Sequence, residues 1–106
     1  MAKARQLIFM GSRIDGVEAE RIGLVTEAVD GALLHQRAKK LVAELASKAP
    51  IAMGLVKKLL NNSSNLDIDA LLQLELDAVY TCTTTADWQE GVDAFIENRS
   101  PIFKGN

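Results

Sequence analysis

The chain has 106 residues, of which 48% are hydrophobic and 25% are charged. This length and this balance are typical of one soluble globular domain with a modest core. The formal net charge is −2 and the pI is about 5.3. An acidic balance argues against a nucleic-acid-binding surface and against a polybasic contact with a membrane.

The single cysteine, Cys82, cannot form a disulfide within the chain, and no Cys or His spacing suits zinc. We therefore expect a free core thiol in a reducing compartment.

No apolar run approaches the ~20 residues that span a bilayer, and the apolar segment at the start is too short for a signal peptide. The expected location is the cytoplasm, or the mitochondrial matrix in a eukaryote. Residues 2–9 have helix formers but no preceding cap, as a helix entered midway in a fragment would have.

Local capping signals predict a short helix that begins after Asp15 and ends before Gly23. Asp15 can cap it, and Glu18 can reach back to the Asp15 amide in a capping box. Gly23 can adopt the left-handed conformation that ends a helix, with Leu24 folding back in a Schellman-type contact. The β-branched residues that follow predict a short extended segment over residues 24–29.

Four further helices are predicted from apolar spacing. They cover residues 31–47, residues 50–60 with Pro50 at the first position, residues 66–83, and a last helix between the hydroxyls of Thr83–Thr85 and Pro101. In the last helix Gly91 suggests close backbone approach. Its buried stripe is predicted to consist of Trp88, Val92, Phe95 and Ile96.

The helix over residues 66–83 is apolar around most of its circumference, with a polar line formed only by Asp69, Gln73 and Asp77. A helix of this kind must bury more than one side. A chain this small has few neighbouring helices to cover it, so a partner surface is the favoured explanation. A central core helix is the alternative.

Few residues suggest chemistry by themselves. Two carboxylate pairs stand three or four residues apart on the last helix: Asp87 with Glu90, and Asp93 with Glu97. Each pair could share a face and act as acid and base, but no neighbour in the sequence would separate their pKa values, so a solvated face is preferred. His35 has no second ligand at a metal-binding spacing and is expected at the surface or its boundary. Serine-nucleophile and phosphate-loop motifs are missing.

Two motifs, in order, resemble one family. The first is Arg13-Ile-Asp-Gly-x-Glu-Ala-x-x-Ile-Gly-Leu-Val25, and the second is Glu90-Gly-x-x-Ala-Phe-x-Glu-x-Arg-x-Pro-x-Phe-Lys-Gly105. They resemble the segment after the catalytic core and the C-terminal tail of the enoyl-CoA hydratase/isomerase (crotonase) family. The resemblance implies a mainly α fold: the C-terminal helical, trimerisation region of the crotonase fold, with one short extended segment and without the ββα spiral core. It implies a core-to-tail connection over residues 1–29 and a helical oligomerisation domain over residues 30–106.

The resemblance also implies a function. Family hydratases add water across the 2,3-double bond of an acyl-CoA thioester, using glutamates and two backbone N–H groups of the spiral core. No catalytic residue and no metal ligand is therefore expected here, and the chain alone is expected to be inactive. Coenzyme A enters only as part of the substrate, and the assembly is expected to be a homotrimer or a dimer of trimers.

Three residues are candidates for contact with coenzyme A by this resemblance. Tyr80 could stack on the adenine. Asn98 replaces a lysine that some members offer to the nucleotide, which leaves Arg99 or Lys104 as possible phosphate contacts. The alternatives are a helix-packing role for Tyr80 and a tail-anchoring role for Arg99 and Lys104. For the chain as a whole, the alternative to an enzyme fragment is a free-standing helical protein-interaction module.

Overall fold

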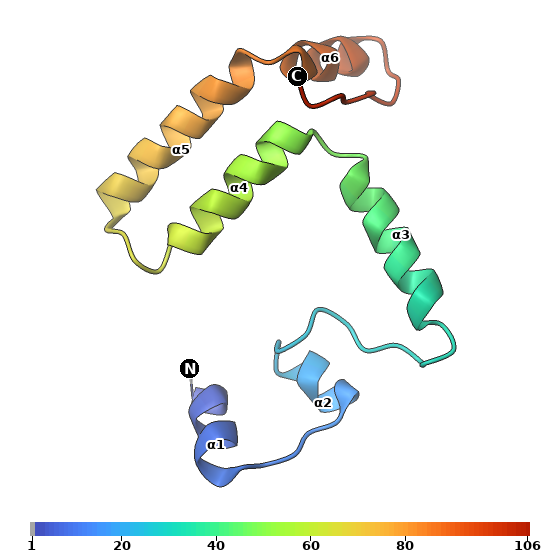
Figure 1. Ribbon diagram of the computed structural model, residues 1–106, viewed down its shortest axis with the longest axis vertical. Helices are drawn as coiled ribbons and strands as arrows, with labels where there is room; N and C mark the ends of the chain where they lie inside the picture. Colours follow the sequence, from blue (N-terminus) through green and yellow to red (C-terminus); the bar gives the residue numbers. More distant parts are fainter. Residues whose placement is uncertain (1) are drawn as a thin grey trace. The chain divides into compact units, whose positions relative to one another are not determined.

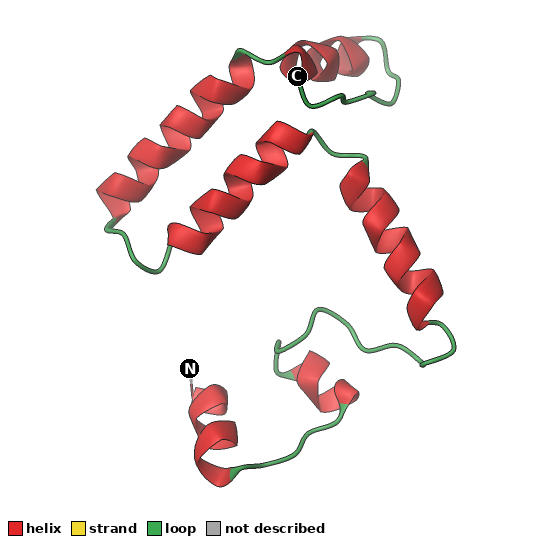
Figure 2. Ribbon diagram, viewed as in Figure 1, coloured by secondary structure: helices red, strands yellow, loops and turns green. Residues whose placement is uncertain are grey.

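The computed structural model describes residues 2–106, and within this range the chain forms α-helices and no strand (Figures 1 and 2). The helices are α1 (Ala2–Met10), α2 (Gly16–Arg21), α3 (Leu34–Ala46), α4 (Pro50–Asn62), α5 (Ile68–Thr83) and α6 (Ala86–Ile96). The prediction of a mainly α chain is confirmed. The chain separates into two compact units, one ending at Lys40 and the other running from Leu41 to Asn106.

Helix α2 begins and ends as its local signals predict. The Asp15 carboxylate accepts a hydrogen bond from the Glu18 N–H at 2.8 Å. At the other end Gly23 has a φ of +74°, and the Leu24 N–H donates to the Ala19 carbonyl at 2.8 Å. These bonds form a Schellman motif, in which a left-handed residue lets the chain satisfy the last carbonyls of a helix.

The second half of the predicted capping box is wrong. The Glu18 carboxylate accepts two hydrogen bonds from the Arg21 guanidinium, at 2.5 and 2.6 Å. A charged donor one turn away attracts the carboxylate more strongly than a neutral amide does. The same guanidinium lowers the pKa of Glu18 below its usual value, mainly through this hydrogen bond.

The short extended segment predicted over residues 24–29 does not form a strand. It contains bends over residues 24–26 and no regular structure over residues 27–30. The Ala28 N–H donates to the Glu20 carboxylate at 3.0 Å, so a side chain accepts a main-chain hydrogen bond in this segment. Helix α3 then begins three residues later than predicted, because Asp30 accepts from the N–H groups of Ala32 and Leu33 in a turn.

Helices α4 and α5 lie side by side and run in opposite directions, and α6 packs against α5 (Figure 1). Pro50 is the first residue of α4, as predicted. Helix α5 begins at Ile68 because the Asp67 carboxylate caps it, accepting from the Ala70 N–H at 2.8 Å. The Thr85 hydroxyl caps α6 by accepting from the Trp88 N–H at 3.1 Å, which confirms the predicted capping hydroxyl.

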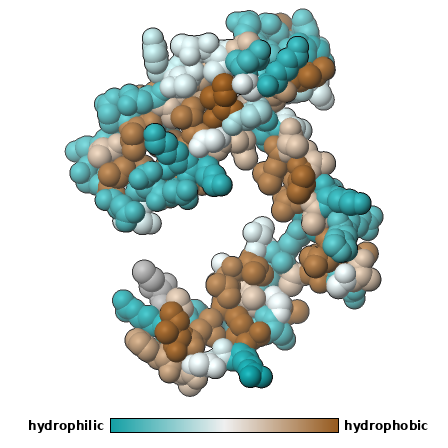
Figure 3. Space-filling model, viewed as in Figure 1, coloured by the Kyte–Doolittle hydropathy of each residue, from teal (hydrophilic) through white to brown (hydrophobic). Residues whose placement is uncertain are grey.

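Few apolar side chains are buried in the described part of the chain. The buried hydrophobic residues are Ala19, Ala78 and Ala94, and no large side chain is fully buried. Hydrophobic residues lie at the surface among hydrophilic ones (Figure 3). The predicted buried stripe of α6 is therefore wrong: Trp88, Val92, Phe95 and Ile96 are 47%, 39%, 85% and 74% exposed. The buried residues of α6 are instead Asp87 and Ala94.

Helix α5 is covered on one side only. Ala78 is buried, and Leu71 and Leu74 are half-buried. An apolar stripe along the rest of the helix is exposed, and we call it the outer stripe of α5: Ile68, Leu72, Leu76, Val79 and Tyr80. A central core helix would have both sides covered, so that alternative does not describe the part of the chain in this structure.

Candidate functional site

The strongest cluster of specific interactions lies where the end of the chain returns along α6 (Figure 1). We call residues 99–106 the C-terminal strap. The strap has no helix or strand. It begins after Asn98, which has a φ of +58° and ends α6 in a second Schellman motif, with the Arg99 N–H donating to the Ala94 carbonyl at 3.0 Å.

Asp87 anchors the far end of the strap. Its carboxylate accepts hydrogen bonds from the N–H groups of Lys104 at 2.7 Å and Gly105 at 2.8 Å. Its own N–H donates to the carbonyl of Asn106 at 3.2 Å. Asp87 is 4% exposed, so the prediction that it belongs to a solvated face is wrong. A buried carboxylate must be hydrogen-bonded, and here main-chain groups of the strap meet that need.

Glu90 anchors the near end of the strap. Its two carboxylate oxygens accept from the Arg99 guanidinium at 2.6 and 2.9 Å, and one also accepts from the Ile102 N–H at 2.8 Å. These bonds, that to Arg99 first, lower the pKa of Glu90 to about 2. Arg99 also donates to Glu97 at 2.6 Å, and the pKa of its guanidinium is raised.

The carboxylates of α6 are therefore bound to partners other than each other. Asp93 accepts from the Gln89 side chain at 2.8 Å, and Glu97 accepts from Arg99. A general acid at neutral pH needs a raised pKa, whereas the pKa of Glu90 is lowered. Asp87 and Glu90 position the strap, and neither carboxylate pair acts as an acid and base pair.

The strap contacts the helices at two glycines. The ring of Phe103 lies over Gly91, where a methyl group would come 3.6 Å from Cε1. This distance is an ordinary van der Waals contact, so Phe103 packs on Gly91 but the close backbone approach predicted there is not required by the packing. Gly105 has a φ of +79° and lies against the first residue of α4, where an added methyl group would meet Pro50 at 3.4 Å. The strap thus reaches the beginnings of both α4 and α6.

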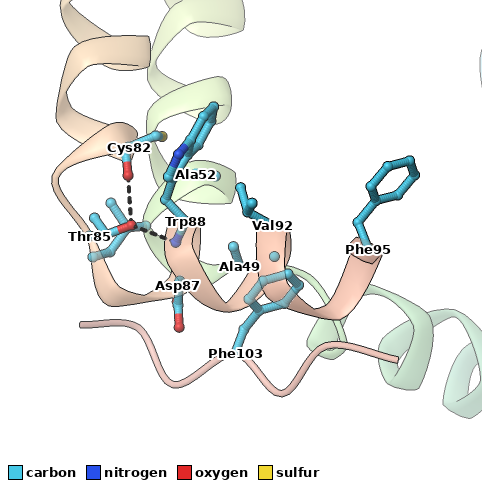
Figure 4. A pocket seen from close by; sticks show the side chains of 11 residues that line it. Ala49, Ala52, Cys82, Thr85, Asp87, Trp88, Val92, Phe95 and Phe103 are labelled. Carbon is cyan, nitrogen blue, oxygen red and sulfur yellow. Dashed lines mark hydrogen bonds between the residues drawn. The ribbon is translucent and has the colours of Figure 1, made fainter. Parts of the chain in front are cut away.

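A pocket with a volume of about 350 Å³ opens beside the strap (Figure 4). It is lined by Ala49, Ile51, Ala52, Cys82, Thr85, Asp87, Trp88, Gly91, Val92, Phe95 and Phe103. The Thr85 hydroxyl donates to the Cys82 carbonyl at 2.7 Å, and both Asp87 oxygens are occupied by the strap. Cys82 is a half-buried free thiol. The lining is chiefly apolar and can hold an apolar group.

The three candidates for contact with coenzyme A lie on two segments, Tyr80 on α5 and Arg99 and Lys104 on the strap. Tyr80 lies on the outer stripe of α5 and is 73% exposed. Arg99 is held by Glu90 and Glu97. The main chain of Lys104 is bound to Asp87, while the residue is exposed. No hydrogen bond joins Tyr80 to the strap within residues 2–106, so a shared nucleotide site remains a prediction.

The structure also bears on His35, on metal binding and on membrane spans. His35 is exposed, in agreement with a surface histidine. Among the described residues no three His, Cys, Asp or Glu side chains group in a way that could hold a metal ion. None of the helices from Ala2 onward has the length and apolar character needed to cross a membrane.

The sequence profile of the enoyl-CoA hydratase/isomerase family matches residues 1–106. The chain belongs to this family. It is 39% identical over 99 residues to a short-chain-enoyl-CoA hydratase of Clostridium acetobutylicum, covering 93% of this chain and 38% of that protein. It is 33% identical over 104 residues to the 1,2-epoxyphenylacetyl-CoA isomerase of Escherichia coli, covering 98% of this chain and 40% of that protein.

Its fold is that of part of a crotonase-family enzyme. The crystal structure of an enoyl-CoA hydratase from Bacillus anthracis superposes with a TM-score of 0.94 at 37% identity, over 100% of this chain and 41% of that one. The chain thus spans about two fifths of the relatives it matches, in their C-terminal portion. The family and fold expected from the two motifs are confirmed.

Sequence reasoning missed the anchoring role of Asp87, although the second motif contained a signal. Several residues of that motif contact each other where the strap meets α6: Glu90 binds Arg99, and Gly91 packs against Phe103. The motif spans α6 and the strap because the strap turns back and contacts this helix. Asp87 lies three residues before the motif begins, so the pattern did not include it.

Proposed function

We propose that the chain is the C-terminal helical part of an enzyme that acts on acyl-CoA thioesters, with hydration of the 2,3-double bond as the reaction. The observation that carries this proposal is the match of the family profile along the whole chain. The relatives at 39% and 37% identity carry the names short-chain-enoyl-CoA hydratase and crotonyl-CoA hydratase. The isomerase from Escherichia coli supports isomerisation as the second candidate reaction.

The chain alone is proposed to have no hydratase activity. The carboxylates of α6 are bound by the strap or by neighbouring side chains, and none is free beside the pocket to act on a substrate. The test is hydration of crotonyl-CoA by the purified 106-residue chain, measured beside a full-length protein that contains it. Turnover by the full-length protein only is expected. Turnover by the short chain would overturn the proposal.

The helical part is proposed to build the homotrimer or dimer of trimers. The outer stripe of α5 supports this, because exposed apolar residues at helical spacing gain free energy when a neighbouring surface covers them. Its members are between 49% and 73% exposed. A free-standing interaction module would use the same stripe, and the coding sequence upstream of Met1 distinguishes the two proposals.

Contact with coenzyme A is proposed for Tyr80, with Lys104 or Arg99 near the phosphates. The exposed ring of Tyr80 is open to stacking, whereas Arg99 would have to leave Glu90 to bind a phosphate. The test is titration of coenzyme A into the full-length protein with Tyr80→Ala or Tyr80→Phe. A loss of affinity in the first and not in the second is expected. An unchanged affinity in both would remove Tyr80 from the site. The proposed compartment is the cytoplasm, or the mitochondrial matrix in a eukaryote.

A further inference from the structure

The C-terminal strap is attached at only a few points. Phe103 and Gly105 are half-buried, and the other strap residues are exposed. The strap therefore has little apolar burial of its own, apart from the ring of Phe103. Its attachment depends on hydrogen bonds to two carboxylates of one helix, Asp87 and Glu90.

The two anchors lie on either side of Phe103. On one side the Ile102 N–H donates to Glu90 at 2.8 Å. On the other side the Lys104 N–H donates to Asp87 at 2.7 Å. The main chain on both sides of the ring is thus held at the helix, and the ring is directed onto Gly91.

Phe103 is also a wall of the apolar pocket. In the close view its ring lies below Ala49 and Val92, on the side of the pocket that faces the strap (Figure 4). Most of the other walls belong to α4, α5 and α6, whose main chains are held by helical hydrogen bonds. Ala49 and Thr85 are the N-cap residues of α4 and α6, so among the lining residues Phe103 is the large apolar wall that can leave without disturbing a helix or its cap.

We propose that the strap is a conformational latch: while Asp87 holds it, Phe103 closes one side of the apolar pocket, and when the strap detaches the pocket opens on that side. Segments without secondary structure and with few apolar contacts open at a lower free energy than the helices they cover. Asn98, in the left-handed conformation, and the exposed Ser100 provide the place where the chain swings. This latch is independent of the proposed enzymatic function.

The test compares Asp87→Asn with Asp93→Asn by NMR in the full chain. Asp93 is the matched control, because its carboxylate lies on the same helix and accepts from Gln89 and not from the strap. The Asp87 variant is expected to speed amide exchange at Lys104 and Gly105 by at least about tenfold, since a hydrogen bond to a charged acceptor is lost. The Gly91 Hα signals should lose the ring-current shift that Phe103 causes.

Phe103→Ala supplies the reference for an open pocket, because it removes the ring and leaves both anchors. The proposal requires the Gly91 signals of Asp87→Asn to move toward those of Phe103→Ala, with Asp93→Asn unchanged. Unchanged Gly91 signals, or amides of Lys104 and Gly105 that keep their protection, would overturn it. If Asp87→Asn loses helical circular dichroism, Lys104→Pro decides by amide exchange at Gly105 and by the Gly91 signals, because it removes the Lys104 donor to Asp87 and leaves α6 intact.

Discussion

At the scale of single residues, Glu90 makes the strap sensitive to acid. Its pKa is lowered from an ordinary 4.5 to about 2 by the Arg99 guanidinium and the Ile102 N–H. A carboxylate with a lowered folded-state pKa stabilises the fold above its unfolded pKa, and this stabilisation is lost as the pH falls through the folded value. The melting temperature should therefore fall more steeply between pH 4.5 and 2 than it does in Glu90→Gln. Parallel profiles of the two proteins in that range would contradict this role.

The backbone conformation of Asn98 decides how substitutions at this position change the stability of the fold. Its φ of +58° lies in the left-handed region, where a β-branched side chain is strained. Asn98→Val should lower the free energy of unfolding by about 1–2 kcal/mol, as measured by denaturant titration. Asn98→Gly is the control, because glycine adopts this conformation without strain, and it should be no less stable than the wild type. Equal losses in the two variants would show that the side chain, and not the conformation, matters.

At the scale of the element, α6 contains a glycine that packing does not require. A methyl group at Gly91 would lie 3.6 Å from the Phe103 ring, which is ordinary van der Waals contact. Alanine is more favourable than glycine inside a helix by about 0.8–1.0 kcal/mol. Gly91→Ala should therefore raise the free energy of unfolding by up to about 1 kcal/mol. A loss of stability in thermal denaturation would mean that Phe103 lies closer to the helix in solution.

At the scale of the whole molecule, the described residues expose many large apolar side chains and bury few. We therefore expect the exposed apolar faces of the helices to contribute to subunit association. Leu76 is 64% exposed on the outer stripe of α5. In the full-length protein, Leu76→Gln should weaken subunit association in sedimentation velocity, while the stability of the short chain changes by less than about 0.5 kcal/mol. The neighbouring exposed residue supplies the control, Glu75→Gln, which should leave association unchanged. Unaltered association in Leu76→Gln would remove this stripe from the interface.

The local structure could be predicted from the sequence because its causes act within a few residues. Asp15 and Thr85 cap helices by bonds to residues three positions away, and Gly23 ends a helix through its own backbone freedom. The family could likewise be predicted, because the first motif contains the Asp15 cap and the Gly23 turn and the second contains residues that join the strap to α6. Local reasoning was wrong at Glu18, where Arg21 competed for the carboxylate.

Only the tertiary structure decided which residues are covered. Asp87 was expected in water, yet it binds N–H groups 17 and 18 residues further along the chain. Trp88 and Phe95 were expected in a core, yet they are exposed. Periodicity shows that a helix has an apolar side, but burial depends on whether another segment lies against that side. The sequence by itself determined the helices, the ends that carry a local cap, and the family, while the return of the strap onto α6 decided what its carboxylates do.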